Sequence, residues 1–315
     1  MDLRHLKNFV VIVDCGSLSK AAERVFVAQP ALSQQLAILE SELGTQLMLR
    51  SRQGVVPTEA GKVLYRHARS LLRQVEQVKQ EVTLPGTGEI GPVGVGLPNT
   101  VSNVLGLPLF ERVRARHPGI RLHLFEAMSG YLGELLGHGR LDMAVQFISA
   151  DTRGLNVIPL VNEDLYVLGH TGGDNTSEEC SLKELDGVPI VLPLSAQGIR
   201  MFVERSFAQG GLELNVIADV DSIGTVVAIA RRGAACAILP LSSLVPFDDG
   251  KVVPRRKLVS PNMRRSVGLA WSGALPQTNA AAAVRQIVVE LVEELVNEGR
   301  WPGATLATPS TEASS

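Results

Sequence analysis

Residues 17–42 read SLSKAAERVFVAQPALSQQLAILESE, and this stretch decides how the first part of the chain folds. Ser17 can cap the free N–H groups of a short helix, and the small side chains of Ala21 and Ala22 allow a second helix to cross closely. Pro30 falls in the first turn of that second helix, where it removes no helical hydrogen bond. The stretch therefore predicts a helix, a tight turn and a second helix, which is the outline of a helix-turn-helix.

The second helix has one apolar face and one polar face. Its leucines recur at helical spacing (Leu32, Leu36 and Leu39). A glutamine amide offers a donor and an acceptor that match the N6/N7 edge of adenine, and a serine hydroxyl can act as either. The candidates for DNA binding on the polar face are Gln29, Pro30, Ser33 and Gln34. The alternative is that these side chains only solvate an exposed helix face.

Two neighbouring segments complete a winged unit around this pair of helices. Residues 3–13 place leucine, phenylalanine and valine on one helical face, which supplies a third helix for a core. Residues 47–57 contain two short apolar runs around a basic turn with a glycine, which is typical of a β-hairpin. We expect Arg50 and Arg52 on this hairpin to reach DNA phosphates or the adjacent minor groove.

A long helix is expected over residues 58–82, with Thr58 as its cap. Its apolar positions alternate in steps of four and three, as in a heptad seam that pairs with a partner helix. The predicted dimerisation residues are Leu64, Ala68, Leu71, Val75 and Val78. The alternative is an amphipathic helix that lies on its own domain.

Residues 1–69 as a whole resemble the N-terminal third of a LysR-type transcriptional regulator. The features that carry this resemblance are Leu6, Phe9, Gly16-Ser17-Leu18, Ala21-Ala22, residues 29–33, Leu39-Glu40, Leu43-Gly44, Leu47, Arg50 and residues 57–61. Residues 11–14, 28–35 and 54–61 are especially similar to the nitrogen assimilation control proteins of that family. The resemblance implies a bacterial DNA-binding regulator that works as a homodimer or homotetramer.

Charge and length divide the chain in the same way. Residues 1–82 hold 11 Lys+Arg and 8 Asp+Glu, a net charge of +3, whereas the remainder holds 19 and 24, a net charge of −5. A chain of 315 residues exceeds one usual core. The expected parts are a winged helix-turn-helix (1–58), a dimerising linker helix (59–82), a hinge (83–91), an effector-binding domain (92–300) and a disordered tail (301–315).

From residue 92 onward, apolar runs alternate with helical stretches, which predicts βαβ units and parallel sheets. The pattern repeats in two halves, so we expect two α/β lobes, one over about 92–161 and 266–300 and the other over about 162–265. Such a pair of lobes resembles the effector domain of LysR-type regulators and periplasmic solute-binding proteins. The fold class is therefore multidomain, an α-rich winged head followed by a two-lobed α/β domain.

A ligand site is expected where the strands of the two lobes end. Parallel-sheet proteins bind ligands at the carboxyl ends of strands, beside helix N-termini that attract anions. The effector-binding candidates there are Asn99, Thr100, Ser129, Phe147, Ser195, Arg200 and Ser222, with Arg200 as counter-charge for a small anionic metabolite. The alternative for the serine, threonine and asparagine side chains is that they merely cap helices.

An enzyme and a solute-binding protein are the competing interpretations of the second part. The three cysteines form no CxxC pair, the six histidines show no metal-ligand spacing, and no catalytic motif is present, so we expect no catalytic residues, metal or cofactor. The chain begins MDLRHLKNF without an apolar signal segment, which favours the cytoplasm over a membrane. The alternative function is a cytoplasmic small-molecule-binding protein or α/β enzyme that uses the helix-turn-helix only for assembly. The expected partners are double-stranded DNA, a small effector, further copies of the chain and RNA polymerase.

Overall fold

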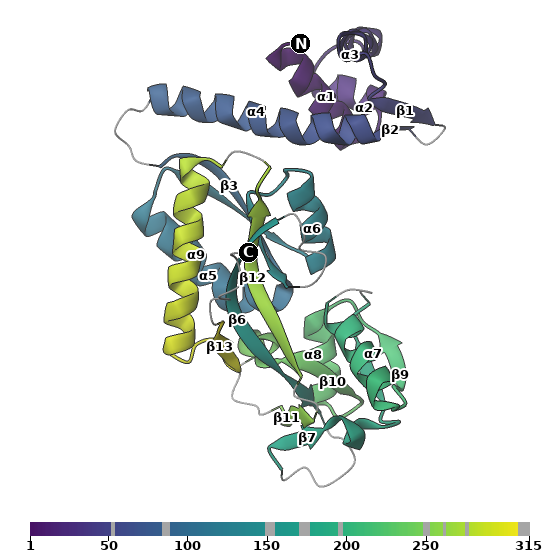
Figure 1. The fold of residues 1–315 in the computed structure, drawn as a ribbon, viewed down its shortest axis with the longest axis vertical. Coiled ribbons are helices and arrows are strands. Elements are labelled where there is room, and N and C mark those ends of the chain that lie inside the picture. The colour runs from purple at the N-terminus through teal and green to yellow at the C-terminus, as the bar shows by residue number, and fades with distance from the viewer. Residues whose placement is uncertain are drawn as a thin grey trace, which may run out of the picture.

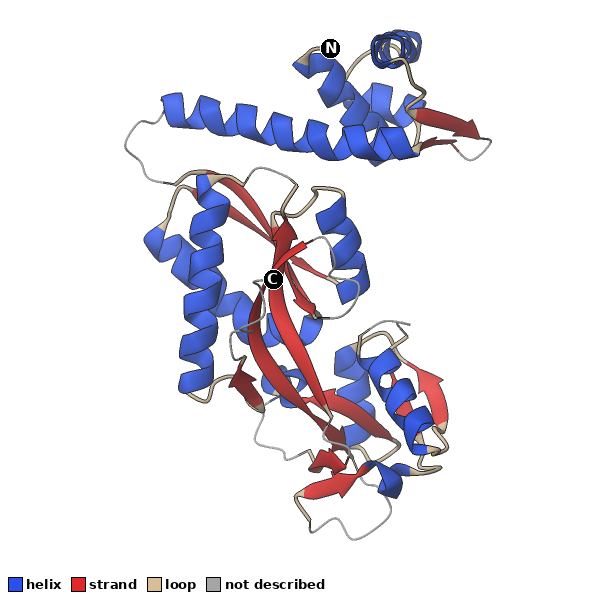
Figure 2. Cartoon of the chain, viewed as in Figure 1, coloured by secondary structure: helices blue, strands red, loops and turns tan. Residues whose placement is uncertain are grey.

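The computed structural model describes residues 1–51, 54–83, 89–148, 155–169, 177–194, 198–247, 253–260, 263–274 and 277–307. Figure 1 shows a small helical head at the N-terminus, a long helix that leads away from it, and two α/β lobes. Figure 2 shows that strands occupy the middle of both lobes and that helices lie on their outside. The described part of the chain is therefore multidomain, with a helical head and a mixed α/β remainder, as predicted.

The head is a three-helix unit with a hairpin. Its elements are α1 (Leu3–Cys15), α2 (Leu18–Arg24), α3 (Gln29–Leu43), β1 (Met48–Ser51) and β2 (Gly54–Pro57). The two strands pair antiparallel, with Met48 opposite Pro57 and Ser51 opposite Gly54. Its core is built from the apolar faces of all three helices and the hairpin. The hairpin therefore packs on the helices as a wing.

The helix α4 (Glu59–Thr83) follows directly from the hairpin. Thr58 caps it, because its Oγ1 accepts a hydrogen bond from the backbone N–H of Gly61 at 3.0 Å. Residues 84–88 of the predicted hinge lie outside the described residues, and the chain continues at Glu89.

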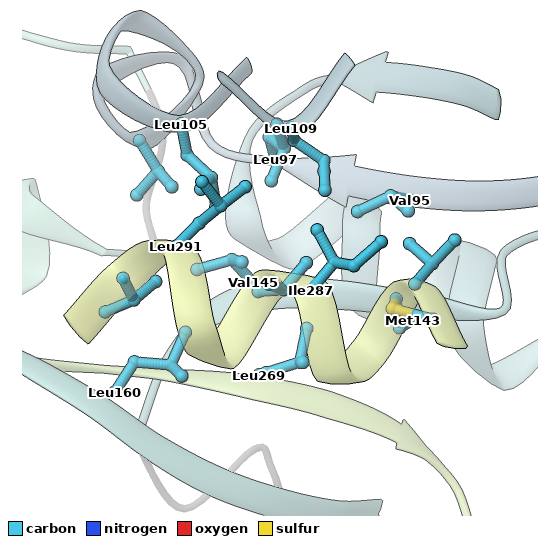
Figure 3. Close-up of a cluster of buried hydrophobic side chains, with 14 of the residues drawn as sticks. Val95, Leu97, Leu105, Leu109, Met143, Val145, Leu160, Leu269, Ile287 and Leu291 are labelled. Atoms are coloured by element: carbon cyan, nitrogen blue, oxygen red, sulfur yellow. The ribbon is translucent and has the colours of Figure 1, made fainter. Parts of the chain in front are cut away.

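The first lobe is built on parallel strands flanked by helices. Its elements are β3 (Gly91–Leu97), α5 (Asn99–Arg116), β4 (Ile120–Glu126), α6 (Ser129–Gly137), β5 (Met143–Phe147), β12 (Arg264–Ser272) and α9 (Asn279–Asn297). β3 pairs in parallel with β4 and β5, and β12 returns antiparallel beside β5. Figure 3 shows α9 packed over the sheet, with Ile287 and Leu291 facing Val145, Leu97 and Leu105. The chain thus returns to the first lobe near its end.

The second lobe repeats the pattern. Its elements are β7 (Glu179–Ser181), η2 (Leu182–Leu185), β8 (Ile190–Leu192), α7 (Ile199–Gly210), β9 (Val216–Asp219), α8 (Ile223–Arg231), β10 (Cys236–Pro240), η3 (Leu241–Ser243), η4 (Val245–Phe247) and β11 (Arg255–Ser260). β10 pairs in parallel with β8, and β8 with β9.

One long strand, β6 (Leu155–Leu168), joins the two lobes (Figure 1). Nine of its first ten residues pair with β12, with a register shift at Leu160, and its last four pair with β10 of the second lobe. The sequence predicted only Leu165–Leu168 as a strand, because residues 156, 162 and 163 are polar and interrupt the apolar run. The lobes therefore share a sheet edge to edge, with strand order β4-β3-β5-β12-β6-β10-β8-β9.

The prediction of a disordered tail from residue 301 is wrong for residues 301–307. Trp301 is only 1% exposed, and its indole Nε1 donates to Glu163 Oε1 at 2.9 Å. The short strand β13 (Ala304–Leu306) then pairs antiparallel with β6. The sequence shows no apolar periodicity here, because a single tryptophan and three strand residues provide the attachment. Residues 308–315 lie outside the described residues.

Phe26, in the turn between α2 and α3, has a strained backbone. It is the one non-glycine residue with positive φ (57°) among the described residues, and its side chain is 95% exposed. We expect Phe26→Asn to raise the free energy of unfolding by about 1 kcal/mol, because asparagine tolerates this left-handed conformation better. The control Phe26→Ala removes the same exposed ring but keeps the strain, so its melting temperature should not rise. Equal melting temperatures for both variants would contradict this account.

Candidate functional site

The packing of α2 against α3 presents one face of α3 to solvent. Ser17 caps α2, accepting from Lys20 N at 3.4 Å, and Ala21 and Ala22 are 0% and 3% exposed where the helices cross. The leucine stripe of α3 is buried in the head. Gln29, Pro30 and Gln34 are exposed and Ser33 is partly buried, so the predicted reading residues lie together on and beside the exposed face.

The wing reaches this face through one side chain. Arg50 of β1 donates from Nη2 to Ser33 Oγ at 2.9 Å, which joins the hairpin to the first turns of α3. Arg52 lies outside the described residues. Gln35, by contrast, turns into the head, where its Oε1 accepts from Asn8 Nδ2. The exposed face of α3 thus carries polar side chains with Arg50 beside them, whereas Gln35 has a structural partner in the head.

A polar cluster attaches α4 to α1. Tyr65 is 3% exposed and donates from its hydroxyl to Asp14, and Arg69 Nη1 donates to the Tyr65 hydroxyl at 3.1 Å. Burial and the hydrogen bond to Asp14 raise the pKa of Tyr65, so the phenol stays protonated. The start of α4 is therefore held on the head.

Two of the five predicted seam residues belong to the head instead. Ala68 is fully buried in its core and Leu64 is packed against that core, so both contact the chain's own domain. For these two positions, the alternative of a helix lying on its own domain is right. Further along, Leu71 and Val78 are 42% and 58% exposed and Val75 is partly buried.

A cavity of about 270 Å³ lies between the two lobes. The first lobe contributes the starts of α5 and α6, and the second lobe contributes the starts of α7 and α8. Gly198, before α7, has φ of +75°, and a Cβ there would lie 3.4 Å from the Phe147 ring, so glycine fits this close approach. Within the described residues, α5, α6 and α7 have no side-chain cap. Their free N–H groups favour negative charge in the cavity.

Most of the predicted effector-binding residues line this one cavity. They are Asn99, Thr100, Ser129, Phe147, Arg200 and Ser222, whereas Ser195 lies outside the described residues. Ser222 does cap its helix, since its Oγ accepts from Thr225 N at 3.3 Å, and Asn99 donates to Glu126 at 2.6 Å. Ser129 Oγ is buried and has no hydrogen-bond partner among the described residues.

Arg200 is already neutralised by neighbouring carboxylates. Its Nε donates to Glu204 Oε1 at 2.7 Å and its Nη1 donates to Asp219. These two hydrogen bonds raise the pKa of Arg200. Arg200 therefore lines the cavity, and its positive charge is balanced by Glu204 and Asp219, which are not among the lining residues.

A second arginine, which the sequence analysis did not select, lies in the cavity wall. Arg265 of β12 is 7% exposed and donates from Nε to Glu163 Oε2 at 2.7 Å and from Nη2 to Thr100 Oγ1 at 2.8 Å. Glu163, fully buried on β6, also accepts from Ser242 Oγ at 2.7 Å and from Trp301. Burial lowers the pKa of Arg265 and the charge of Glu163 opposes that shift. This cluster joins both lobes and the C-terminal segment behind the cavity.

The two parts of the chain match two known domains. Residues 3–62 match the bacterial regulatory helix-turn-helix protein domain of the lysR family, and residues 86–293 match the LysR substrate binding domain. The chain belongs to the LysR family. It is 36% identical over 301 residues to the nitrogen assimilation regulatory protein nac of Klebsiella aerogenes, covering 95% of this chain and 98% of the relative.

Solved full-length LysR-type structures share the fold. A full-length OxyR variant from Pseudomonas aeruginosa superposes with a TM-score of 0.74 at 21% identity, over 98% of this chain and 99% of that one. LysG from Corynebacterium glutamicum with bound effector Arg has a TM-score of 0.67 at 21% identity, over 93% and 99% of the two chains. This LysR-type protein is thus a DNA-binding transcriptional regulator with an effector-binding domain.

The sequence of this regulator contains a pattern that indicates buried charges at Arg265 and Glu163. Arg265 alternates in phase with the buried Val267 and Leu269 on β12, and Glu163 alternates in phase with Val161 and Leu165 on β6. A charged residue at an inward position of a strand needs a partner. The period-two pattern could therefore have identified both residues as buried charges, although not as partners.

The cysteines of this LysR-type chain lie away from the cavity, whose described lining includes none of them. Cys180 and Cys236 are buried in the second lobe. Burial raises the pKa of Cys180 to about 11 and also raises that of Cys236. Both thiols are therefore poor nucleophiles at neutral pH.

Across the residues that the structure describes, no group of three potential metal ligands occurs, and no helix has the length and apolarity needed to cross a membrane.

Proposed function

We propose that this LysR-type regulator reads duplex DNA by placing the start of α3 in the major groove, with Gln29, Pro30, Ser33 and Gln34 at the base edges. The observation that carries this proposal is the exposed amide face of α3, with Arg50 of the wing bonded to Ser33 beside it. Arg50 and Arg52 are suited to phosphates next to the groove. The test is a gel-shift titration with a genomic operator and a random competitor.

The chain acts, in this proposal, as a dimer or a dimer of dimers that presents two reading heads to a partly palindromic site. Leu71, Val75 and Val78 on the free part of α4 provide the partner seam. The protein works in the cytoplasm, contacts RNA polymerase at its promoters, and has no catalytic role. A small anionic effector binds in the cavity between the lobes and favours one arrangement of the dimers, since equal affinity for both would shift nothing.

Arg50 on the hairpin leads to a prediction about the salt dependence of DNA binding. Arg50→Ala should weaken binding to specific and random DNA to a similar degree, and should reduce the slope of log K against log salt by about 1. Ser33→Ala is the matched control, because it breaks the same hydrogen bond and leaves the charge in place. An unchanged slope in Arg50→Ala would exclude a phosphate contact.

The seam gives a prediction about assembly. Leu71→Asp should convert the dimer to a monomer in size-exclusion chromatography with light scattering, because a buried aspartate in a helix pair has no counter-charge. Val63→Asp is the matched control, since Val63 is 46% exposed on the same helix but lies outside the seam. A dimer that survives Leu71→Asp would place the interface elsewhere.

A further inference from the structure

The guanidinium of Arg265 has one unused donor in the wall of the cavity. Glu163 and Thr100 engage Nε and Nη2, whereas Nη1 is buried without a hydrogen-bond partner among the described residues. A buried donor that lacks an acceptor is unfavourable, because it has lost its hydration and gained nothing in return. Nη1 therefore needs an acceptor that those residues do not supply.

An acceptor can come from the cavity, because Arg265 is part of the cavity lining. Glu163 already receives Arg265, Ser242 and Trp301 behind the cavity. The Phe147 ring lies over the guanidinium, with Arg265 Cζ 4.1 Å from the ring centroid, and Phe147 itself lines the cavity. For a ligand to reach the buried Nη1, this ring would have to rotate.

The surroundings select the charge of that ligand. Ser129 Oγ is a second buried polar atom without a described partner, and the uncapped starts of α5, α6 and α7 border the same space. These groups favour one negative charge. The exposed carboxylates of Glu126 and Asp221 also line the cavity and repel a second negative charge.

We propose that Arg265 Nη1 binds the carboxylate of a small monocarboxylic acid, with Ser129 Oγ as a second polar contact. Arg265 is favoured over Arg200 because its Nη1 is a buried donor without a partner among the described residues, whereas Arg200 is bound by Glu204 and Asp219. The rest of the ligand lies against apolar side chains of Met128, Ile199 and Phe147. We expect a dicarboxylate or a phosphate ester to bind more weakly, because Glu126 and Asp221 repel a second negative charge. This inference rests on the proposed effector role of the cavity and assigns its ligand class.

The test measures the melting temperature of the full chain with acetate, acetamide or malonate at 100 mM and constant ionic strength. Acetate should raise it by about 2 °C relative to chloride, because ligand that binds only the folded state stabilises it. Acetamide and malonate should not raise it. Arg265→Lys should abolish the acetate response by losing the Nη1 donor, whereas Arg200→Lys should keep it.

Each opposite result overturns the proposal. These results are no acetate response in the wild type, an equal response to acetamide or malonate, or a full response in Arg265→Lys. The acetamide and malonate measurements need no variant, so they remain decisive if Arg265→Lys does not fold. A full acetate response in Arg265→Lys overturns the proposal even if Ser129→Trp, which fills the cavity, abolishes the response, because acetate would then bind in the cavity without Arg265. The proposed function in DNA binding is tested separately, by gel shifts without acetate, so its failure can be distinguished from failure of the acetate proposal.

Discussion

Glu163→Leu is expected to lower the free energy of unfolding by about 3–5 kcal/mol, because it leaves the Arg265 charge buried without its partner. Glu163 is fully buried, and its two carboxylate oxygens receive Arg265, Ser242 and Trp301. The variant therefore also leaves two neutral donors without their acceptor, Ser242 Oγ on the second lobe and Trp301 Nε1 on the C-terminal segment. Chemical denaturation followed by circular dichroism measures the loss.

The double variant Glu163→Leu with Arg265→Met separates the charge effect from damage to packing. Replacing both members of a buried ion pair by apolar side chains removes the uncompensated charge, so the double variant should regain most of the lost stability. The control Glu294→Gln breaks an ion pair at the surface, where Arg112 Nη2 lies 2.8 Å from Glu294 Oε2, and should leave the unfolding transition nearly unchanged. A double variant as unstable as Glu163→Leu would show that the pair is not the cause.

The second large effect is expected in DNA discrimination. Gln29→Ala should reduce the ratio of specific to random binding by about 5- to 150-fold, because one bidentate amide–adenine contact is worth about 1–3 kcal/mol. Binding to random DNA should change little, because Gln29 is uncharged. Gel-shift titrations at one fixed salt concentration measure both affinities.

Gln35→Ala is the matched control for this measurement. Gln35 lies in the same helix, but its amide oxygen is bonded to Asn8 inside the head. Its replacement should lower the melting temperature of the head and keep the discrimination between operator and random DNA. If Gln29→Ala discriminates as well as the wild type, the base-reading role of that residue must be abandoned.

The head could be predicted almost completely because its signals are local. The Ser17 cap, the alanine pair, Pro30 and the leucine stripe each act within a few residues, and helix caps and turns depend on that range. The same holds for the alternation of strands and helices in the lobes. Most of the expected ligand residues at the strand ends line one cavity for a related reason, since the topology brings those ends together.

The remaining features depend on contacts between distant segments. Ala68 fits a heptad seam as well as it fits the head core, and only the packing of α4 on α1 decides between them. Glu163 and Arg265 are 102 residues apart, and Trp301 joins them from the far end of the described chain. The sequence does not distinguish Arg200 from Arg265. In the structure both are paired with carboxylates, but only Arg265 has a buried donor without a partner among the described residues.

The sequence by itself determined the helix-turn-helix, the wing and the order of strands and helices, because each follows from caps, turns and the spacing of apolar residues along the chain. Only the tertiary structure decided which part of α4 is free for a partner and which of the two cavity-lining arginines has a buried donor without a described partner. The reason is that burial and charge pairing are set by neighbours in space, and a polar side chain becomes a binding group only where those neighbours leave it unsatisfied.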